Sequence, residues 1–211
     1  MIPQPTFVFH FTHINNLPLI LADGGLRTCG ALRQAGVNYK DVAYSTMQDR
    51  RARKSVTCGV GGTLHDYVPF YFAPRSPMLY TISKGNVPGY DEGQRPLIFF
   101  VSSAQAIQQA GLPFVFTDGH AVMDISNFFT DLDQLHQVDW QVIKAKMWNS
   151  TEAAPDKMRL RQAEFLVHEF VPWNLIAHIG TVSPLIEKTV LAHLAEMDHT
   201  PEVRVRPNWY Y

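Results

Sequence analysis

The sequence predicts a single α+β domain over residues 1–211, and three observations lead to this class. Segments typical of strands occur near both ends of the chain and in its middle, at irregular spacing. The regular alternation of strand and helix that marks a doubly wound parallel sheet is absent, and no G-x-G-x-x-G follows a strand. Hydrophobic residues make up 46% of the chain, which is enough for one sizeable core. We therefore expect small sheets with intervening loops.

The first 64 residues predict one strand, one short helix and a long loop. Residues 6–11 combine threonine, valine and aromatic side chains, as buried strands do. Pro18 is tolerated in the first turn of a helix, and Gly24 supplies the left-handed position that ends this helix after about two turns. Residues 29–64 show little periodicity, so we expect a long loop with a short helix around residues 42–51. Loops of that length in a compact domain are usually functional or mobile.

The rest of the chain predicts strands and helices in mixed order. Runs rich in β-branched and aromatic residues indicate strands at 68–73, 96–101, 112–117, 164–170 and 203–205. Capping residues and apolar positions at helical spacing indicate helices at 103–109, 126–137, 139–148 and 184–197. The chain contains no internal repeats, low-complexity tracts or linkers, which agrees with one domain.

Charge, cysteines and hydropathy exclude several classes of protein. A formal net charge of −1 argues against a surface coated with basic residues for duplex binding, but it leaves room for one basic groove. Cys29 and Cys58 form neither a disulfide framework nor a C-x-x-C zinc pair, which fits a reducing compartment. No secretory leader and no run of about 18 apolar residues is present. We expect a cytoplasmic protein that does not enter a membrane.

Common hydrolase and metal signatures are missing as well. His10 and His13 are spaced as metal ligands can be on a helix, but they follow a strand and lack the third ligand and the general base of H-E-x-x-H. No G-x-S-x-G and no Walker A loop occurs. We expect no metal site. A metal-dependent hydrolase that uses His10 and His13 remains an alternative, and it would lose its activity to chelators.

Three separated segments carry a more specific pattern. A strand ends in His10-x-Thr12 and precedes "ILADGGLR", "FYFA" is followed by Ser76, and "EFLVH" begins with Glu164. This order resembles the His–Tyr–Glu class of ADP-ribosyltransferases. The resemblance implies two small sheets around an NAD cleft with flanking helices. It further implies that His10 and Thr12, with His13 beside them, hold the nicotinamide riboside, that Tyr71 marks the second strand and that Glu164 meets the ribose 2′-hydroxyl.

The whole chain is similar, more specifically, to the DarT family of DNA ADP-ribosyltransferase toxins. The stretches that carry this similarity span Phe9 to Tyr211 and are "FHFTHINNL", "AYSTMQDRRARK", "GGTLHDYVPFYFAPRSPMLY", "FFVSSAQA", "GLPFVFTDGHAV", "RQAEFLV" and "WYY". The similarity implies transfer of ADP-ribose from NAD to a base of single-stranded DNA, usually thymine, and a macrodomain antitoxin that reverses the modification. The chain departs from the wider superfamily at Phe11, where many relatives have glycine.

The reaction itself requires groups of this kind. Cleavage of the nicotinamide–ribose bond leaves an oxocarbenium-like sugar, which a nearby carboxylate such as Glu164 stabilises. Arg51 can hold the pyrophosphate or stabilise the acceptor base. The weakly acidic N3 proton of thymine must be removed, and His120 or Glu164 can accept it. We therefore expect Glu164, Arg51 and His120 to be catalytic, and Arg51 also to bind NAD.

A single-stranded acceptor favours aromatic or apolar shelves flanked by cations. The candidate DNA contacts are Tyr71, Arg75, Met78, Tyr80, Arg95, Arg159 and Arg161. Taken singly, each arginine is more often a solvated surface charge, and Tyr71 and Met78 can equally belong to the core. Two alternatives stay open: an ADP-ribosyltransferase that modifies RNA or protein, and a module that binds NAD or nucleic acid without turnover.

Overall fold

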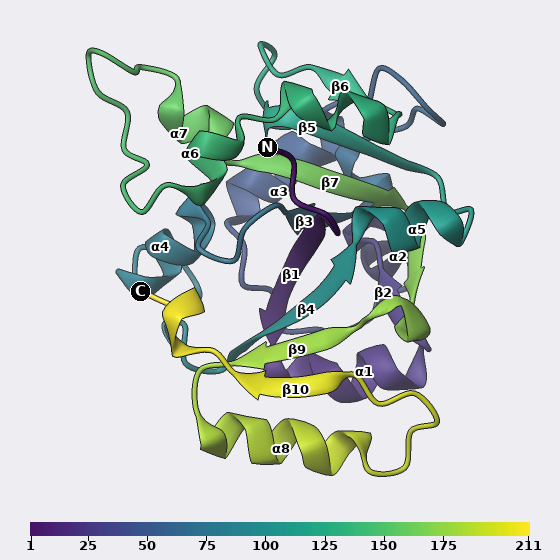
Figure 1. Ribbon diagram of the computed structural model, residues 1–211. Helices are drawn as coiled ribbons and strands as arrows, with labels where there is room; N and C mark the ends of the chain where they lie inside the picture. The colour runs from purple at the N-terminus through teal and green to yellow at the C-terminus, as the bar shows by residue number, and fades with distance from the viewer.

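The computed structural model describes residues 1–211, and an eight-stranded sheet organises the fold (Figure 1). The strand order is β10-β9-β4-β1-β3-β7-β5-β6, and all neighbours are antiparallel except β9 and β10. A second sheet pairs β2 with β8. The strands are β1 (Phe7–His13), β2 (Gly25–Arg27), β3 (Tyr67–Tyr71), β4 (Leu97–Ser103), β5 (Phe114–His120), β6 (Phe128–Phe129), β7 (Ala163–His168), β8 (Phe170–Pro172), β9 (His178–Thr181) and β10 (Glu202–Val205).

The helices are short and surround the sheet, with α8 lying beside β9 and β10 (Figure 1). The α-helices are α1 (Leu17–Ala22), α2 (Cys29–Gln34), α3 (Ser45–Arg53), α4 (Pro77–Ser83), α5 (Ala104–Gln109), α6 (Trp140–Lys144), α7 (Lys157–Leu160) and α8 (Pro184–Leu194). Turns of 3₁₀ helix span Ile14–Asn16, Leu64–Asp66, Leu132–Gln137, Trp173–Leu175 and Pro207–Trp209. None of the helices is long and apolar enough to cross a membrane.

Alternation along the central strands fills both faces of the sheet. In β4, Ile98 and Phe100 join the largest apolar cluster, whereas Leu97 and Phe99 belong to a second cluster. Successive side chains of a strand point to opposite faces, so these two clusters lie on opposite sides of β4. All four side chains are essentially inaccessible to solvent. Burial on both faces fixes the register of β4 and of its neighbour β1.

The sheet opens between β1 and β3. Strand β1 pairs with β4 along its whole length, but its only partner position in β3 is Phe9 opposite Tyr71. Pro69 has no backbone N–H and cannot extend the β1–β3 ladder. In place of a ladder bond, Nδ1 of His10 donates to the carbonyl oxygen of Pro69 at 2.8 Å. The divergence of these two strands leaves space for a cleft.

The last residues of the chain pack back onto the sheet. The Tyr210 hydroxyl donates to the carbonyl oxygen of Leu97 at 2.8 Å, and the backbone N–H of Tyr211 donates to Oε1 of Gln94 at 3.0 Å. The indole of Trp209 lies over Gly180 so closely that a Cβ at that position would clash with the ring. These contacts fix the aromatic end of the chain against β4 and β9.

The expected α+β class is confirmed, with three differences in detail. One sheet is large, rather than two being small, because β5, β7 and β3 continue the sheet that contains β1. The short helix expected around residues 42–51 is present as α3, but the segment 29–64 also contains a second helix, α2, that was not expected. The helix expected at 126–137 is wrong, because this stretch forms β6 and a 3₁₀ turn.

Candidate active site

A cleft of about 400 Å³ lies beside the divergence of β1 and β3. Seven of the residues expected at the site line it: His10, Thr12, Arg51, Tyr71, Met78, His120 and Glu164. They come from β1, α3, β3, α4, β5 and β7, so the fold brings together segments from the whole length of the chain. Concave sites of this size, lined by apolar side chains with a few polar groups among them, are typical of small-molecule binding.

Glu164 is the second residue of β7 and is 1% exposed. One carboxylate oxygen, Oε2, accepts a hydrogen bond from Nη1 of Arg51 at 2.8 Å, and the other, Oε1, accepts from the backbone N–H of Ala121 at 3.1 Å. Its own backbone N–H donates to Oγ1 of Thr117 at 3.0 Å. Both carboxylate oxygens are therefore held in place, with Tyr71 directly opposite Glu164 on the neighbouring strand.

Arg51 reaches the cleft from α3, and 13% of its side chain is exposed. Burial disfavours the guanidinium ion, but the negative charge of Glu164 outweighs this effect and raises the pKa of Arg51. Its second terminal nitrogen, Nη2, is buried and has no hydrogen-bond partner. A buried donor without a partner calls for a ligand or an ordered water. The lining of the cleft thus contains a cation with an unused donor.

His10 and Thr12 form the β1 wall of the cleft. Since Nδ1 of His10 donates to Pro69, Nε2 is left as an acceptor, and burial lowers the pKa of the imidazole. The His10 ring lies parallel to Phe100, with centroids 6.4 Å apart. Oγ1 of Thr12 accepts from Nδ2 of Asn16 at 2.9 Å, which leaves the hydroxyl hydrogen of Thr12 free to donate. A neutral histidine acceptor and a hydroxyl donor therefore share this wall.

Asn16 is a site residue that the sequence interpretation missed. Its side chain is buried and makes two hydrogen bonds to the backbone of Lys40, accepting from the N–H at 2.7 Å and donating to the carbonyl oxygen at 2.9 Å. These bonds hold the segment 37–44 against Thr12 at the cleft. The only signal in the sequence was an asparagine between a strand and a helix, which usually indicates a cap or a turn.

His120 ends β5 and lines the cleft beside Glu164. Burial lowers the pKa of its imidazole, Glu164 opposes this shift and Arg51 adds to it. The imidazole is therefore neutral at pH 7. Burial, reinforced by Glu164, also raises the pKa of Tyr71, so its phenol keeps its proton. The Tyr71 hydroxyl lies 3.9 Å from the Met78 sulfur, and the Phe11 ring stacks on Tyr71 at a centroid distance of 6.3 Å.

Arg75 and Tyr80 lie outside the cleft lining, on a surface shared with Tyr211. The Arg75 guanidinium lies over the Tyr211 ring, 4.5 Å from its centroid, and Nε of Arg75 is buried without a partner. Tyr80 is 39% exposed, and its ring packs against Trp148 and Tyr211. This surface pairs exposed aromatic area with a cation that has no acidic partner.

Two further candidates do not reach the cleft. Because β1 continues through His13, alternation turns that side chain away from the face of His10 and Thr12. Nε2 of His13 lies 3.1 Å from Glu92, and Nδ1 accepts from the N–H of Asn15. His13, expected to bind NAD, is therefore not among the residues that line the cleft. Arg95 is exposed and is not among the residues that line the cleft.

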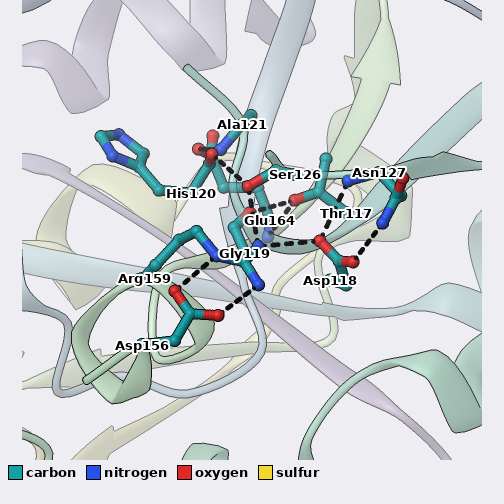
Figure 2. A network of polar contacts seen from close by, with 10 residues as sticks. All are labelled: Thr117, Asp118, Gly119, His120, Ala121, Ser126, Asn127, Asp156, Arg159 and Glu164. Atoms are coloured by element: carbon teal, nitrogen blue, oxygen red, sulfur yellow. Dashed lines mark hydrogen bonds and ion pairs between the residues drawn. The ribbon is translucent and has the colours of Figure 1, made fainter. Parts of the chain in front are cut away.

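Arg159 and Arg161 also differ from expectation, because both are committed to protein groups. Arg159 bonds to Asp156, Asp118 and Ser126, as Figure 2 shows. Arg161 is 6% exposed and donates to the carbonyl oxygens of Arg75 and Val142. Sequence alone identifies a charge but not its partners, and these partners lie 3 to 86 positions away. Neither residue lines the cleft.

The structure contains no group of three or more histidine, cysteine or acidic side chains placed to hold a metal ion. Cys29 and Cys58 are free thiols, and Sγ of Cys29 contacts the Tyr39 hydroxyl at 3.2 Å.

The known proteins to which this chain is similar are DNA ADP-ribosyl transferases. The family model described as "ssDNA thymidine ADP-ribosyltransferase, DarT" matches residues 9–211. A DNA ADP-ribosyl transferase of Thermus sp. (strain 2.9) is 46% identical over 99% of this chain and 98% of that protein. A DNA ADP-ribosyl transferase–DNA ADP-ribosyl glycohydrolase fusion protein of Thermosipho africanus is 34% identical over 39% of this chain and 20% of its own length.

Solved structures agree with this fold. Thermus sp. 2.9 DarT in complex with ADP-ribosylated ssDNA matches with a TM-score of 0.93 at 44% identity, over 99% of this chain and 98% of that one. The same protein in complex with NAD⁺ matches with a TM-score of 0.90 at 42% identity, over the full length of both chains. The ADP-ribosyltransferase fold expected from the sequence is confirmed.

Proposed function

Because this chain belongs to the DarT family of single-stranded-DNA thymidine ADP-ribosyltransferases, we propose that it transfers ADP-ribose from NAD to thymine in single-stranded DNA. Residues 1–211 would act as one catalytic domain. The observation that carries the proposal is the buried Arg51–Glu164 pair, 2.8 Å apart, at the base of a cleft that contains unused hydrogen-bonding groups. The Thermus relative has been solved with NAD⁺ and with ADP-ribosylated ssDNA, which supports the same substrates here.

The polar groups of the cleft suit NAD in chemistry. Nη2 of Arg51 is a buried donor without a partner, suited to an anionic oxygen. Nε2 of His10 and the hydroxyl hydrogen of Thr12 offer one acceptor and one donor on the β1 wall, where the nicotinamide riboside would be held. Tyr71 supplies an aromatic face beside them. Bound NAD would supply the ADP-ribosyl group and nicotinamide as the leaving group.

Glu164 stabilises the positive charge that develops on the ribose when the bond to nicotinamide breaks. It is almost completely buried, so its charge acts through a medium that screens it weakly. The two hydrogen bonds from Arg51 and Ala121 keep the carboxylate oriented before the reaction begins. No reorganisation is then needed in the transition state.

His120 accepts the N3 proton of the thymine. Its imidazole lines the cleft and is neutral at pH 7, because burial lowers its pKa. Glu164 is less suited to this task, since both of its oxygens already accept hydrogen bonds from the protein. The charge that remains on the base is stabilised by the guanidinium of Arg51, which is cationic throughout.

The DNA strand contacts the surface formed by Tyr71, Met78, Tyr80, Arg75 and Tyr211. Bases can stack on aromatic and thioether side chains without regard to sequence. Arg75 has no acidic partner and offers its guanidinium to a phosphate beside these shelves. Single-stranded DNA suits the site because an unpaired base can enter the cleft without the cost of opening a duplex.

The protein would act as the toxin of a toxin–antitoxin pair in the cytoplasm, where NAD and single-stranded DNA are both present. Its partner would be a macrodomain-type DNA ADP-ribosyl glycohydrolase that removes the modification. The fusion of a DNA ADP-ribosyl transferase to a DNA ADP-ribosyl glycohydrolase in the Thermosipho africanus relative supports this pairing.

Labelled NAD tests the proposal directly. The protein is incubated with NAD labelled in the adenylate and, separately, with single-stranded DNA, duplex DNA, RNA or a protein extract. Label on single-stranded DNA, absent with duplex DNA and RNA, is the expected result. Label on protein or RNA alone would overturn the assignment of the acceptor. Retention of intact NAD with every polymer would favour a binding module in place of an enzyme.

A further inference from the structure

The segment that contains the end of β5 and the turn after it lies directly against the carboxylate of Glu164. Its residues, 118–127, supply the Ala121 N–H that bonds Oε1 of Glu164 and the His120 ring that lines the cleft. Figure 2 shows Arg159 together with six residues of this segment, Asp118, Gly119, His120, Ala121, Ser126 and Asn127. The shape of this turn therefore sets two features of the site at once.

Arg159 bonds to this turn at two points. Its Nη1 lies 3.0 Å from Oδ1 of Asp118 and 2.9 Å from Oγ of Ser126, at the start and near the end of the turn. Its Nε and Nη2 form a two-point bond to the carboxylate of Asp156, at 2.8 and 2.6 Å. Such a fork is specific to arginine. Only 12% of the Arg159 side chain is exposed.

Bonds inside the turn transmit this constraint toward Glu164. The Ser126 hydroxyl, while it accepts from Arg159, donates to the carbonyl oxygen of His120 at 2.8 Å. On the other side, the Thr117 hydroxyl donates to the carbonyl oxygen of Gly119 at 2.6 Å and accepts from the backbone N–H of Glu164. The carbonyl groups of Gly119 and His120 are therefore both held by hydrogen bonds from side-chain hydroxyls.

Close packing adds a steric constraint. A Cβ at Gly119 would clash with the guanidinium of Arg159, so the backbone of the turn rests on that side chain. Gly119 is fully enclosed. Loss of the guanidinium would leave a void beneath the turn and remove two of its anchors, and the turn could then settle into another shape.

We propose that Arg159 is a positioning residue that holds the turn 118–127 in the shape needed to orient Glu164 and His120. This rests on the proposed function, since it assigns Arg159 to the same site. It replaces the role in DNA binding that the sequence suggested for this residue. The carboxylates of Asp118 and Asp156 contribute to this role, because they hold the guanidinium of Arg159 in place.

Substitution of Asp118 distinguishes the positioning role of Arg159 from a contact between Arg159 and a DNA phosphate. Asp118→Asn removes one negative charge beside Arg159 and so makes the region more attractive to DNA. If Arg159 contacted phosphate, this variant would bind the oligonucleotide more tightly. If Arg159 positions the turn, the variant weakens the anchor and lowers kcat. The two roles therefore predict changes in different kinetic constants for the same substitution, a lower KM for a phosphate contact and a lower kcat for positioning.

The experiment compares Arg159→Gln, Arg159→Lys and Asp118→Asn with wild type. Arg204→Ala, which breaks an exposed ion pair to Glu202 on β10, is the matched control. The measurements are kcat and KM for a thymine-containing oligonucleotide, together with the hydrogen-exchange rate of the Ala121 amide in the protein without substrates. We expect kcat to fall by about 10²-fold in all three variants, as misplacement of catalytic groups by about 1 Å can produce, with KM little changed. Arg204→Ala should match wild type.

The exchange measurement decides the proposal even if no DNA is modified. Faster exchange at Ala121 in Arg159→Gln, with unchanged protection at Phe165 in the core of β7, supports the positioning role. Unchanged exchange at Ala121 overturns it. A raised oligonucleotide KM with unchanged kcat in Arg159→Gln, or a lowered KM with unchanged kcat in Asp118→Asn, likewise overturns it and restores the phosphate contact. Failure of the proposed function would instead show as wild-type protein that leaves DNA unmodified.

Discussion

The guanidinium of Arg51 lies 2.8 Å from the carboxylate of Glu164, although 113 positions separate the two residues in the chain. The first comes from α3, in a segment outside the large sheet, and the second from β7 in the sheet itself. A buried ion pair is costly to assemble, because both charges lose their hydration. The position of this pair in the lining of the cleft, with one Arg51 nitrogen unpartnered, supports the catalytic role that we propose for it.

Arg51→Lys should reduce DNA modification by about 10²-fold, although it keeps the positive charge. Lysine is a point charge, so it can bond Glu164 but cannot also present a second, coplanar donor as Nη2 of Arg51 does. Arg53→Lys, an exposed change on the same helix, is the control. The comparison uses initial rates with a thymine-containing oligonucleotide and the melting temperature of each variant. Wild-type rates in Arg51→Lys would show that the second donor has no role.

The pH profile should report His120. Burial lowers the pKa of this imidazole below the ordinary 6.5, so it is neutral at pH 7 and becomes protonated only as the pH falls further. A protonated imidazole cannot accept the thymine proton, so kcat should be level near pH 7 and decline on the acid side, with a midpoint below pH 6.5. His120→Gln should lower the plateau and abolish this acid limb. An unchanged limb in the variant would assign it to another group.

Tyr211 should affect DNA binding through Arg75. Tyr211→Leu removes the ring on which the guanidinium rests, a contact of about 0.5–1 kcal/mol at exposed sites, and should raise the oligonucleotide KM by about two- to fivefold. Arg75→Ala should raise KM further and reduce the slope of log KM against log salt by about 0.7, the value for one phosphate contact on a single strand. KM for NAD should stay the same in both variants. An unaltered salt slope in Arg75→Ala would remove the phosphate contact.

Asn16→Ala should loosen the wall of the cleft. The change removes both hydrogen bonds to Lys40 and the one to Thr12, and a buried polar group left unpaired costs about 1–3 kcal/mol. We expect faster proteolysis within residues 37–44 and a higher KM for NAD. Asn15→Ala is the matched control, because Asn15 is the exposed neighbour. Equal proteolysis of the two variants would argue against a role for Asn16 in holding residues 37–44 at the cleft.

The sequence predicted those parts of the site that depend on local pattern. His10, Tyr71 and Glu164 each lie in or next to a strand that β-branched and aromatic residues predicted, whereas their roles at the site came from the resemblance to ADP-ribosyltransferases. Arg51 was found because its segment is similar to a family, since a basic run alone indicates only a solvated helix face. The cleft brings all four together, as the expected fold requires.

What escaped prediction depends on distant or backbone partners. The Ala121 N–H that binds Glu164 has no side-chain signature, and the role of Asn16 depends on a loop 24 residues away. Arg159 was assigned to DNA because its charge is visible in the sequence, whereas its partner Asp118 lies 41 positions earlier. His13 was placed in the cleft because the strand was expected to stop before it. Tertiary pairing determined each of these outcomes.

Mass spectrometry of a short oligonucleotide tests the central claim most directly. Two single-stranded oligonucleotides, identical except that one contains a single thymine and the other none, are incubated with NAD and either wild-type protein or Glu164→Gln. Wild-type protein should add one ADP-ribose to the thymine-containing strand only. Glu164→Gln should do so about 10²–10³ times more slowly while it still binds NAD. An adduct on the thymine-free strand, no adduct on either strand, or full-rate modification by Glu164→Gln would contradict the account.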